Sequence, residues 1–74
     1  MPKTLAQLRL ALALTQAELA EKVGVTRATI LIWENAHYQP HPQHVRLLAE
    51  VLGVSIAEIY AALEASKEQK KGTL

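Results

Sequence analysis

Three histidines in a short stretch, His37, His41 and His44, are the first side chains to examine for chemistry. Imidazole is a common zinc ligand, but zinc sites add cysteines, carboxylates or further histidines to complete the coordination. The chain has no cysteine, and no carboxylate lies between these histidines. His41 stands directly before Pro42, where it is better explained as a residue that caps a helix. We therefore expect no metal site.

The other polar side chains do not form a catalytic set. We find no nucleophile paired with a base, no glycine loop that could cradle a phosphate and no cluster of carboxylates. We expect a binding module, not an enzyme, and no cofactor.

Length, charge and cysteine content narrow the class of protein. The chain has 74 residues, enough for one domain, and its net charge is only +1, so any case for nucleic acid depends on where the charges lie. The lack of cysteine fits a reducing cytoplasm. No apolar run is long enough to span a membrane, and the first four residues do not resemble a signal peptide. We expect a soluble cytoplasmic protein with no membrane partner.

Helix starts are marked by capping residues. A hydroxyl residue followed three positions later by Gln or Glu is typical of a capping box, and the chain has three: Thr4 with Gln7, Thr15 with Glu18, and Ser55 with Glu58. Thr26 and the pair His41–Pro42 mark two further starts. We predict five helices, over 5–13, 16–23, 27–35, 42–52 and 56–64, in an all-α domain of residues 1–65. Residues 66–74 form a polar C-terminal tail, too polar to bury, that either frays or extends the last helix.

The segment from Thr15 to Asn35 has the pattern of two helices that cross steeply around a tight turn. Its inner positions are apolar: Leu19, Val23, Ile30 and Trp33, with Val25 in the corner. Ala20 is small where the helices would cross, and Gly24 can adopt the positive φ that ends the first helix. The alternative is a generic helical hairpin.

This order of residues closely resembles the Cro/C1 (XRE) repressors of phages and bacteria. The resemblance rests on residues 14–27 (LTQAELAEKVGVTR), Ile30, residues 33–35 (WEN) and residues 48–55 (LAEVLGVS), and it covers roughly residues 4–64. It implies a five-helix, lambda-repressor-like domain with a helix-turn-helix at helices two and three. In this family the third helix enters the major groove, usually in a dimer on a palindromic operator. The resemblance also implies an ion pair between Arg9 and Glu34.

Helical spacing then suggests which side chains would touch DNA. With Ile30 facing the core, Ala28, Ile32 and Asn35 lie on the opposite face, Arg27 and Leu31 on one flank, and Thr29 on the other. Arg27 would hold either a guanine or a phosphate, while Ala28 and Ile32 would pack on thymine methyl groups. Thr15 and Thr26 are caps or phosphate anchors, and Tyr38 either fills its loop or touches a phosphate. The candidate DNA-binding residues are Gln16 (by resemblance), Thr26, Arg27, Ala28, Thr29, Ile32, Asn35 and Tyr38.

The outer face of this helix is unusually apolar for the family. Ala36 replaces a common glycine after the third helix, which either strains or reshapes that turn. Few fixed positive charges remain near a groove, so we expect modest DNA binding that depends weakly on salt. Leu10 and Leu12 extend the apolar surface, unless Leu12 is buried and Leu10 is an isolated exposed leucine.

We expect a sequence-specific transcriptional regulator, most simply a repressor that occludes a promoter. It would act as a homodimer with contacts drawn from five residues of the last two helices: Val54, Ile56, Ile59, Tyr60 and Leu63. The alternative is an antitoxin-like or phage-encoded module of the same fold that binds a protein through Leu10, Leu31 and Ile32.

Overall fold

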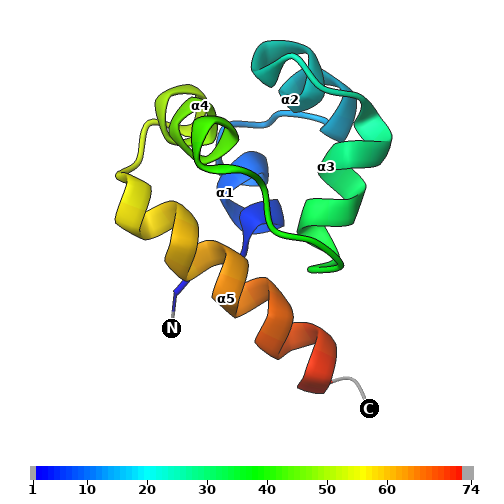
Figure 1. The fold of residues 1–74 in the computed structure, drawn as a ribbon, viewed down its shortest axis with the longest axis vertical. Helices are drawn as coiled ribbons and strands as arrows, with labels where there is room; N and C mark the ends of the chain where they lie inside the picture. Colours follow the sequence, from blue (N-terminus) through cyan, green and yellow to red (C-terminus); the bar gives the residue numbers. More distant parts are fainter. Residues whose placement is uncertain (1, 73–74) are drawn as a thin grey trace.

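The computed structural model describes residues 2–72, and over these residues the chain is all-α (Figure 1). The helices are α1 (Leu5–Ala11), α2 (Gln16–Val23), α3 (Arg27–Glu34), α4 (Pro42–Leu52) and α5 (Ile56–Gly72). The predicted fold class is confirmed, and α2 and α4 have the predicted bounds. α2 packs on α3 and α4, while α1 packs mainly on α5 and to a smaller extent on α3 (Figure 1).

The predicted caps are confirmed at four helix starts. Three capping boxes form, each with a hydroxyl that accepts from a backbone N–H and a Gln or Glu that reaches back: Thr4 with Gln7 (3.2 and 2.8 Å), Thr15 with Glu18 (3.0 and 2.8 Å), and Ser55 with Glu58 (3.1 and 3.1 Å). Thr26 accepts from the N–H of Thr29 at 3.2 Å. His41 occupies the N-cap position of α4 but makes no side-chain capping bond, and Pro42 follows at the first turn, where no N–H is needed.

Every helix contributes to one apolar core. Each supplies one side chain with no exposed surface: Leu5, Leu19, Ile30, Leu48 and Ile59. The predicted inner positions Val23 and Trp33 are buried, as is Ala20 where α2 and α3 meet, and half-buried Val25 packs against the same core. The core therefore holds α2 against α3 through the apolar positions that the sequence pattern predicts.

α1 is shorter than predicted because its last turn gives way to a left-handed residue. Ala13 has φ 56°. The N–H of Leu14 then donates back to the carbonyl of Arg9 at 3.3 Å, which closes the end of the helix. α1 therefore ends at Ala11 and not at residue 13.

α5 is longer than predicted, because residues 66–72 extend the last helix, which is one of the two alternatives for the polar tail. The expectation that the tail is too polar to bury is wrong at its first residue. Ser66 is buried: its Oγ accepts from the N–H of Leu5 at 3.2 Å and donates to the carbonyl of Ala62 at 2.9 Å. Because the Ser66 hydroxyl both donates and accepts a hydrogen bond, its burial costs little free energy. The bond also gives a partner to the N–H of Leu5, which has none within the first turn of α1. The helix then continues to Gly72, and its last turns extend past the other helices (Figure 1). No helix within residues 2–72 has the length and apolar character of a membrane span.

Candidate nucleic-acid interface

The turn between α2 and α3 is built by one glycine and one apolar plug. Gly24 has φ 84°, and its N–H donates to the carbonyl of Ala20 at 2.8 Å. The N–H of Val25 donates to the same carbonyl at 2.9 Å, which turns the Val25 side chain towards the core. The predicted positive φ of Gly24 is confirmed, and α3 starts directly after this turn, at the capping residue Thr26.

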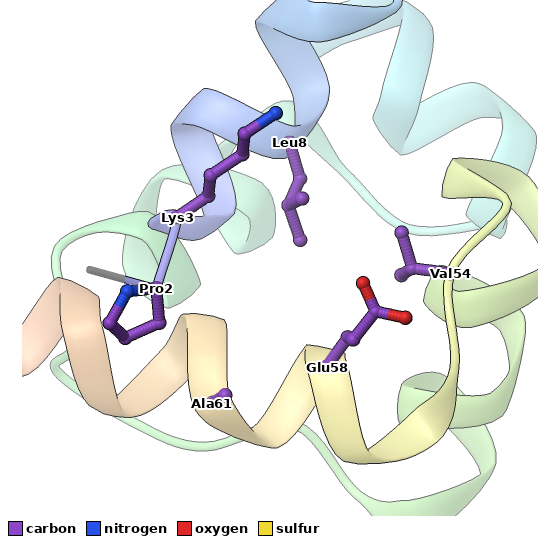
Figure 2. Close-up of a pocket in the computed structure, with 6 residues that line it drawn as sticks. All are labelled: Pro2, Lys3, Leu8, Val54, Glu58 and Ala61. Atoms are coloured by element: carbon purple, nitrogen blue, oxygen red, sulfur yellow. The ribbon is translucent and has the colours of Figure 1, made fainter.

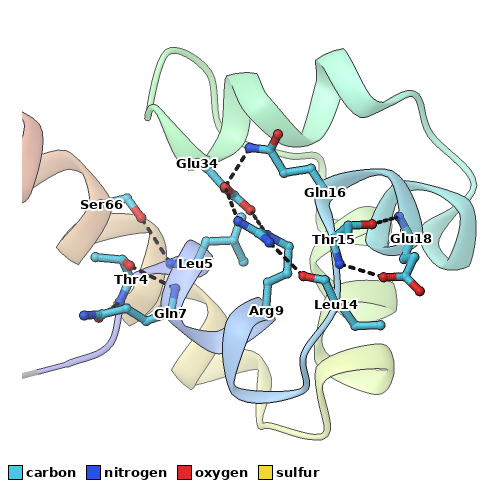
Figure 3. A network of polar contacts seen from close by, with 10 residues as sticks. All are labelled: Thr4, Leu5, Gln7, Arg9, Leu14, Thr15, Gln16, Glu18, Glu34 and Ser66. Carbon is cyan, nitrogen blue, oxygen red and sulfur yellow. Dashed lines mark hydrogen bonds and ion pairs between the residues drawn. The ribbon is translucent and has the colours of Figure 1, made fainter.

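A nearly buried ion pair ties α1 to the end of α3 (Figure 3). Arg9 Nε donates to Glu34 Oε2 at 2.7 Å, and Arg9 Nη2 donates to Glu34 Oε1 at 3.3 Å. Arg9 Nη1 also donates to the carbonyl of Leu14 at 2.7 Å, which fixes the connection between α1 and α2. The ion pair that the resemblance implied is confirmed. Both side chains are nearly buried, and each charge has the other as its partner.

Gln16, the first residue of α2, joins the same network. Its Nε2 donates to Glu34 Oε1 at 3.0 Å, so the amide bridges the start of α2 to the end of α3 (Figure 3). This contact was not predicted, because the two residues lie 18 positions apart and the resemblance pointed only to DNA.

The first turn of α3 presents most of the other predicted DNA contacts. Arg27 and Ala28 are exposed, and Asn35, which ends the helix, is exposed as well. Thr29 is half-buried, and its hydroxyl shares a 3.0 Å hydrogen bond with that of Thr26. Both hydroxyls are thus occupied in ordering the start of α3, as expected of a cap.

Ile32 does not lie on the open outer face, contrary to our placement by helical spacing. It is half-buried and packs against the core. The chain folds back directly after α3, where the N–H of His37 donates to the carbonyl of Ile32 at 3.1 Å. Helical spacing within α3 alone cannot anticipate this, because the burial of Ile32 depends on a core to which all five helices contribute. The following segment, with buried Pro40, returns past α3 on its way to α4 (Figure 1).

The exposed apolar side chains are therefore distributed differently from the predicted patch. Leu31 stays exposed on α3, and Leu10 and Leu12 are exposed at the end of α1. The alternative in which Leu12 is buried is wrong, since 49% of its surface is accessible. Tyr38 is 72% exposed in the loop after α3 and does not fill that loop.

A polar hollow at the start of α4 was missed by the sequence analysis. It has a volume of about 460 Å³ and is lined by His41, Pro42, Gln43 and Arg46. The ring of His44 packs at a tilt of 45° against that of Trp33, with centroids 5.4 Å apart, and so joins this end of α4 to α3. The sequence signal for this hollow is Arg46. It lies one turn into a helix that starts with proline, and it is polar where the inner positions of that helix are apolar.

A second hollow lies between the start of the chain and α5. It has a volume of about 320 Å³, and its lining residues are Pro2, Lys3, Leu8, Val54, Glu58 and Ala61 (Figure 2). None of these residues belongs to α2 or α3, so this hollow is separate from the candidate interface.

One acidic side chain at the start of α2 has a shifted pKa. The backbone N–H and the hydroxyl of Thr15 lower the pKa of Glu18 by hydrogen bonding, and nearby Lys22 lowers it slightly further. Glu18 is therefore charged over a wider acidic range than an ordinary glutamate, at a helix end that favours negative charge.

Comparisons with known proteins agree with this geometry. A family model described as Helix-turn-helix matches residues 5–59. An HTH-type transcriptional regulator of Methanothermobacter thermautotrophicus, itself uncharacterised, is 50% identical over 42 residues, which are 57% of this chain and 61% of that protein. The chain thus covers less than two thirds of that relative.

Another uncharacterised HTH-type transcriptional regulator, from Methanocaldococcus jannaschii, is 40% identical over 47 residues, covering 64% of this chain and 71% of that protein. No solved structure gives a significant match. Residues 5–59, which the family model matches, include all of α2, the turn and α3, as well as Arg9 and Glu34. This chain belongs to the helix-turn-helix family of Cro/C1 type, whose relatives are transcriptional regulators.

Proposed function

We propose that this protein is a sequence-specific DNA-binding regulator that lays α3 in the major groove. The observation that carries the proposal is the exposed first turn of α3, with Arg27 and Ala28 at the helix start and the opposite face packed in the core. A helix presented in this way fits the width of the groove, and its N-terminal residues reach base edges.

The exposed residues at the start of α3 favour both a polar and an apolar contact with DNA bases. The guanidinium of Arg27 matches guanine O6 and N7, and the Ala28 methyl group fits beside a thymine methyl. Ile32 is a weaker candidate than the sequence suggested, because part of its surface is taken by the core. Arg46, which is exposed and lines the hollow at the start of α4, is a second candidate cation.

A binding selection from a randomised DNA pool tests the proposal directly. We expect the purified protein to enrich a palindromic sequence, and Arg27→Ala to weaken binding to it by about 1–3 kcal/mol. Loss of preference at one base position in that variant indicates guanine readout. A uniform loss, with the salt dependence reduced by about one charge, indicates a phosphate contact.

The matched control is Lys3→Ala, which removes the same charge from the hollow beside α5 (Figure 2). We expect this variant to retain the base preference in full. A selection that enriches nothing with folded protein would contradict DNA binding and favour the protein-binding alternative through Leu10 and Leu31.

We also propose that the protein binds as a homodimer and represses by covering a promoter. Two of the residues first considered for the dimer, Ile59 and Leu63, are buried in the core and are not available. Ile56 and Tyr60 stay 43% and 44% exposed, four residues apart on one face of α5. They are the best remaining anchors for a second copy.

A further inference from the structure

The carboxamide of Gln16 is held in place before any DNA arrives. Its Nε2 donates to Glu34 Oε1 at 3.0 Å, and Gln16 itself is only half-buried at the first position of α2. That bond uses one of the two amide N–H groups. Over residues 2–72 the carboxamide has no other hydrogen bond, so its second N–H stays free to donate and its oxygen, which is not buried, stays free to accept.

Glu34 can hold this amide near a nucleic acid because its own charge is balanced. Both carboxylate oxygens accept from Arg9, at 2.7 and 3.3 Å, and the Glu34 side chain is only 7% exposed. An unpaired Glu34 carboxylate would repel the phosphates of DNA. The carboxylate paired with Arg9 does so much less, and the group that it holds at the surface is the neutral amide of Gln16. Arg9 in turn is fixed by the carbonyl of Leu14 at 2.7 Å.

We propose that Glu34 is a positioning residue for the Gln16 carboxamide, so that the Arg9–Glu34 pair contributes to DNA affinity as well as to the fold. The proposal rests on the DNA-binding function proposed above. Gln16 is the group that touches the DNA backbone, and Glu34 acts only through it.

The physical basis is the ordering of a flexible side chain. A free glutamine loses rotamer freedom when it binds a phosphate, and that loss weakens the contact. A glutamine already fixed by Glu34 has lost most of this freedom on folding. Its contact with DNA should therefore be worth about tenfold in affinity, against about twofold for an unrestrained glutamine.

A double-mutant cycle on the selected operator tests this coupling. Gln16→Leu is measured in the wild-type background and in a background that carries Arg9→Met and Glu34→Leu together. Replacing both members of a buried pair avoids leaving one charge without a partner and is often tolerated. We expect Gln16→Leu to weaken binding about tenfold in the first background and about twofold in the second.

A second background guards against misfolding of the first. In Arg9→Met combined with Glu34→Gln, no buried charge loses its partner and the side-chain oxygen at position 34 can still accept from Gln16, so we expect the cost of Gln16→Leu to stay near tenfold there. In the free protein, the side-chain amide of Gln16 should be as ordered by NMR relaxation in this second background as in wild type. Gln43→Leu, at the start of α4 and without a bond to Glu34, is the control whose cost should be the same in all backgrounds.

The outcomes separate the two proposals. Equal costs of Gln16→Leu in wild type and in the background with Arg9→Met and Glu34→Leu would overturn the positioning role, while the DNA-binding function would stand. The same holds if Gln16→Leu costs nothing in wild type. If the wild-type protein itself selects no DNA, both proposals fail.

Discussion

Each of the four connections between helices contains one residue in the left-handed backbone region. Gly24 and Gly53 serve two of them, with φ 84° and 69°, while alanine serves the others: Ala13 at 56° and Ala36 at 58°. Glycine adopts this region freely, whereas a Cβ there crowds the carbonyl oxygen at a cost of roughly 1 kcal/mol. Of the two alternatives for Ala36, the strained turn is therefore the one that the chain adopts.

We predict that Ala36→Gly stabilises the protein. Relief of the strained φ is offset in part by the greater entropy of glycine in the unfolded chain, so we expect a gain of about 0.5–1 kcal/mol in the free energy of unfolding. Urea denaturation followed by circular dichroism measures it.

The control for this prediction is the reverse exchange at Gly24. A Cβ at Gly24 would meet nothing within 4 Å, so Gly24→Ala should cost about 1 kcal/mol through the backbone alone. A destabilised Ala36→Gly would show that the loop after α3 depends on a contact of the Ala36 methyl group.

α2 depends on its capping box because it is only eight residues long. Helices of this length are marginal alone, and their ends carry several N–H groups without partners. Thr15 and Glu18 satisfy two such donors, and the Glu18 carboxylate also sits at the positive end of the helix. The start of α2 is also where Gln16 is presented, so its order bears directly on the interface.

We predict that acid weakens this cap. The pKa of Glu18 is lower in the folded chain than its usual value, so its stabilising effect is fully present above the usual glutamate range. That effect is lost as the pH falls through the lowered pKa. Wild type should therefore be more stable than Glu18→Gln at neutral pH, and the difference should shrink as the solution is acidified below the usual range.

Unfolding measured from neutral to acidic pH in both proteins gives this difference. The matched control is Glu21→Gln, on the same helix, since Glu21 is exposed and caps no helix among the described residues. If Glu21→Gln shows the same acid-dependent difference, the effect arises from general charge and not from the cap.

At the scale of the whole molecule, α5 closes the domain and also offers a surface. Ser66 ties its far part to the start of α1, and Ile59 places its near part in the core. The face that carries Ile56 and Tyr60 is left exposed. Exposed apolar pairs of this kind on a small domain are typical of partner surfaces.

We predict that Tyr60→Glu disrupts the proposed homodimer. In a two-fold interface the substitution brings two like charges together, so dimerisation should weaken by at least about tenfold. Sedimentation velocity over a range of concentrations measures the change.

Leu10→Glu is the control for the dimer, because Leu10 is a comparably exposed apolar residue at the end of α1. Loss of the dimer in Leu10→Glu, with Tyr60→Glu unaffected, would move the interface to α1. The DNA affinity of Tyr60→Glu should fall together with dimerisation, because a single copy of the chain then binds one half-site of the palindrome without the second copy.

The sequence by itself determined the features that depend on neighbouring residues. Helix starts follow from hydroxyl caps three positions before Gln or Glu, and the inner faces of α2 and α3 follow from apolar spacing. The left-handed Gly24 follows from the absence of a Cβ. Each is a local effect, decided within one or two helical turns, and each is confirmed in the fold.

Only the tertiary structure decided the features that join distant parts of the chain. The bond from Ser66 to Leu5 spans 61 positions, and that from Gln16 to Glu34 spans 18. Ile32 is half-buried for the same kind of reason, because it packs against a core to which all five helices contribute. The spacing of residues within one helix carries no information about which helix end meets which. The contact of the Glu34 carboxylate with Gln16, on which our further proposal rests, is therefore decided only by the packing of α1, α2 and α3.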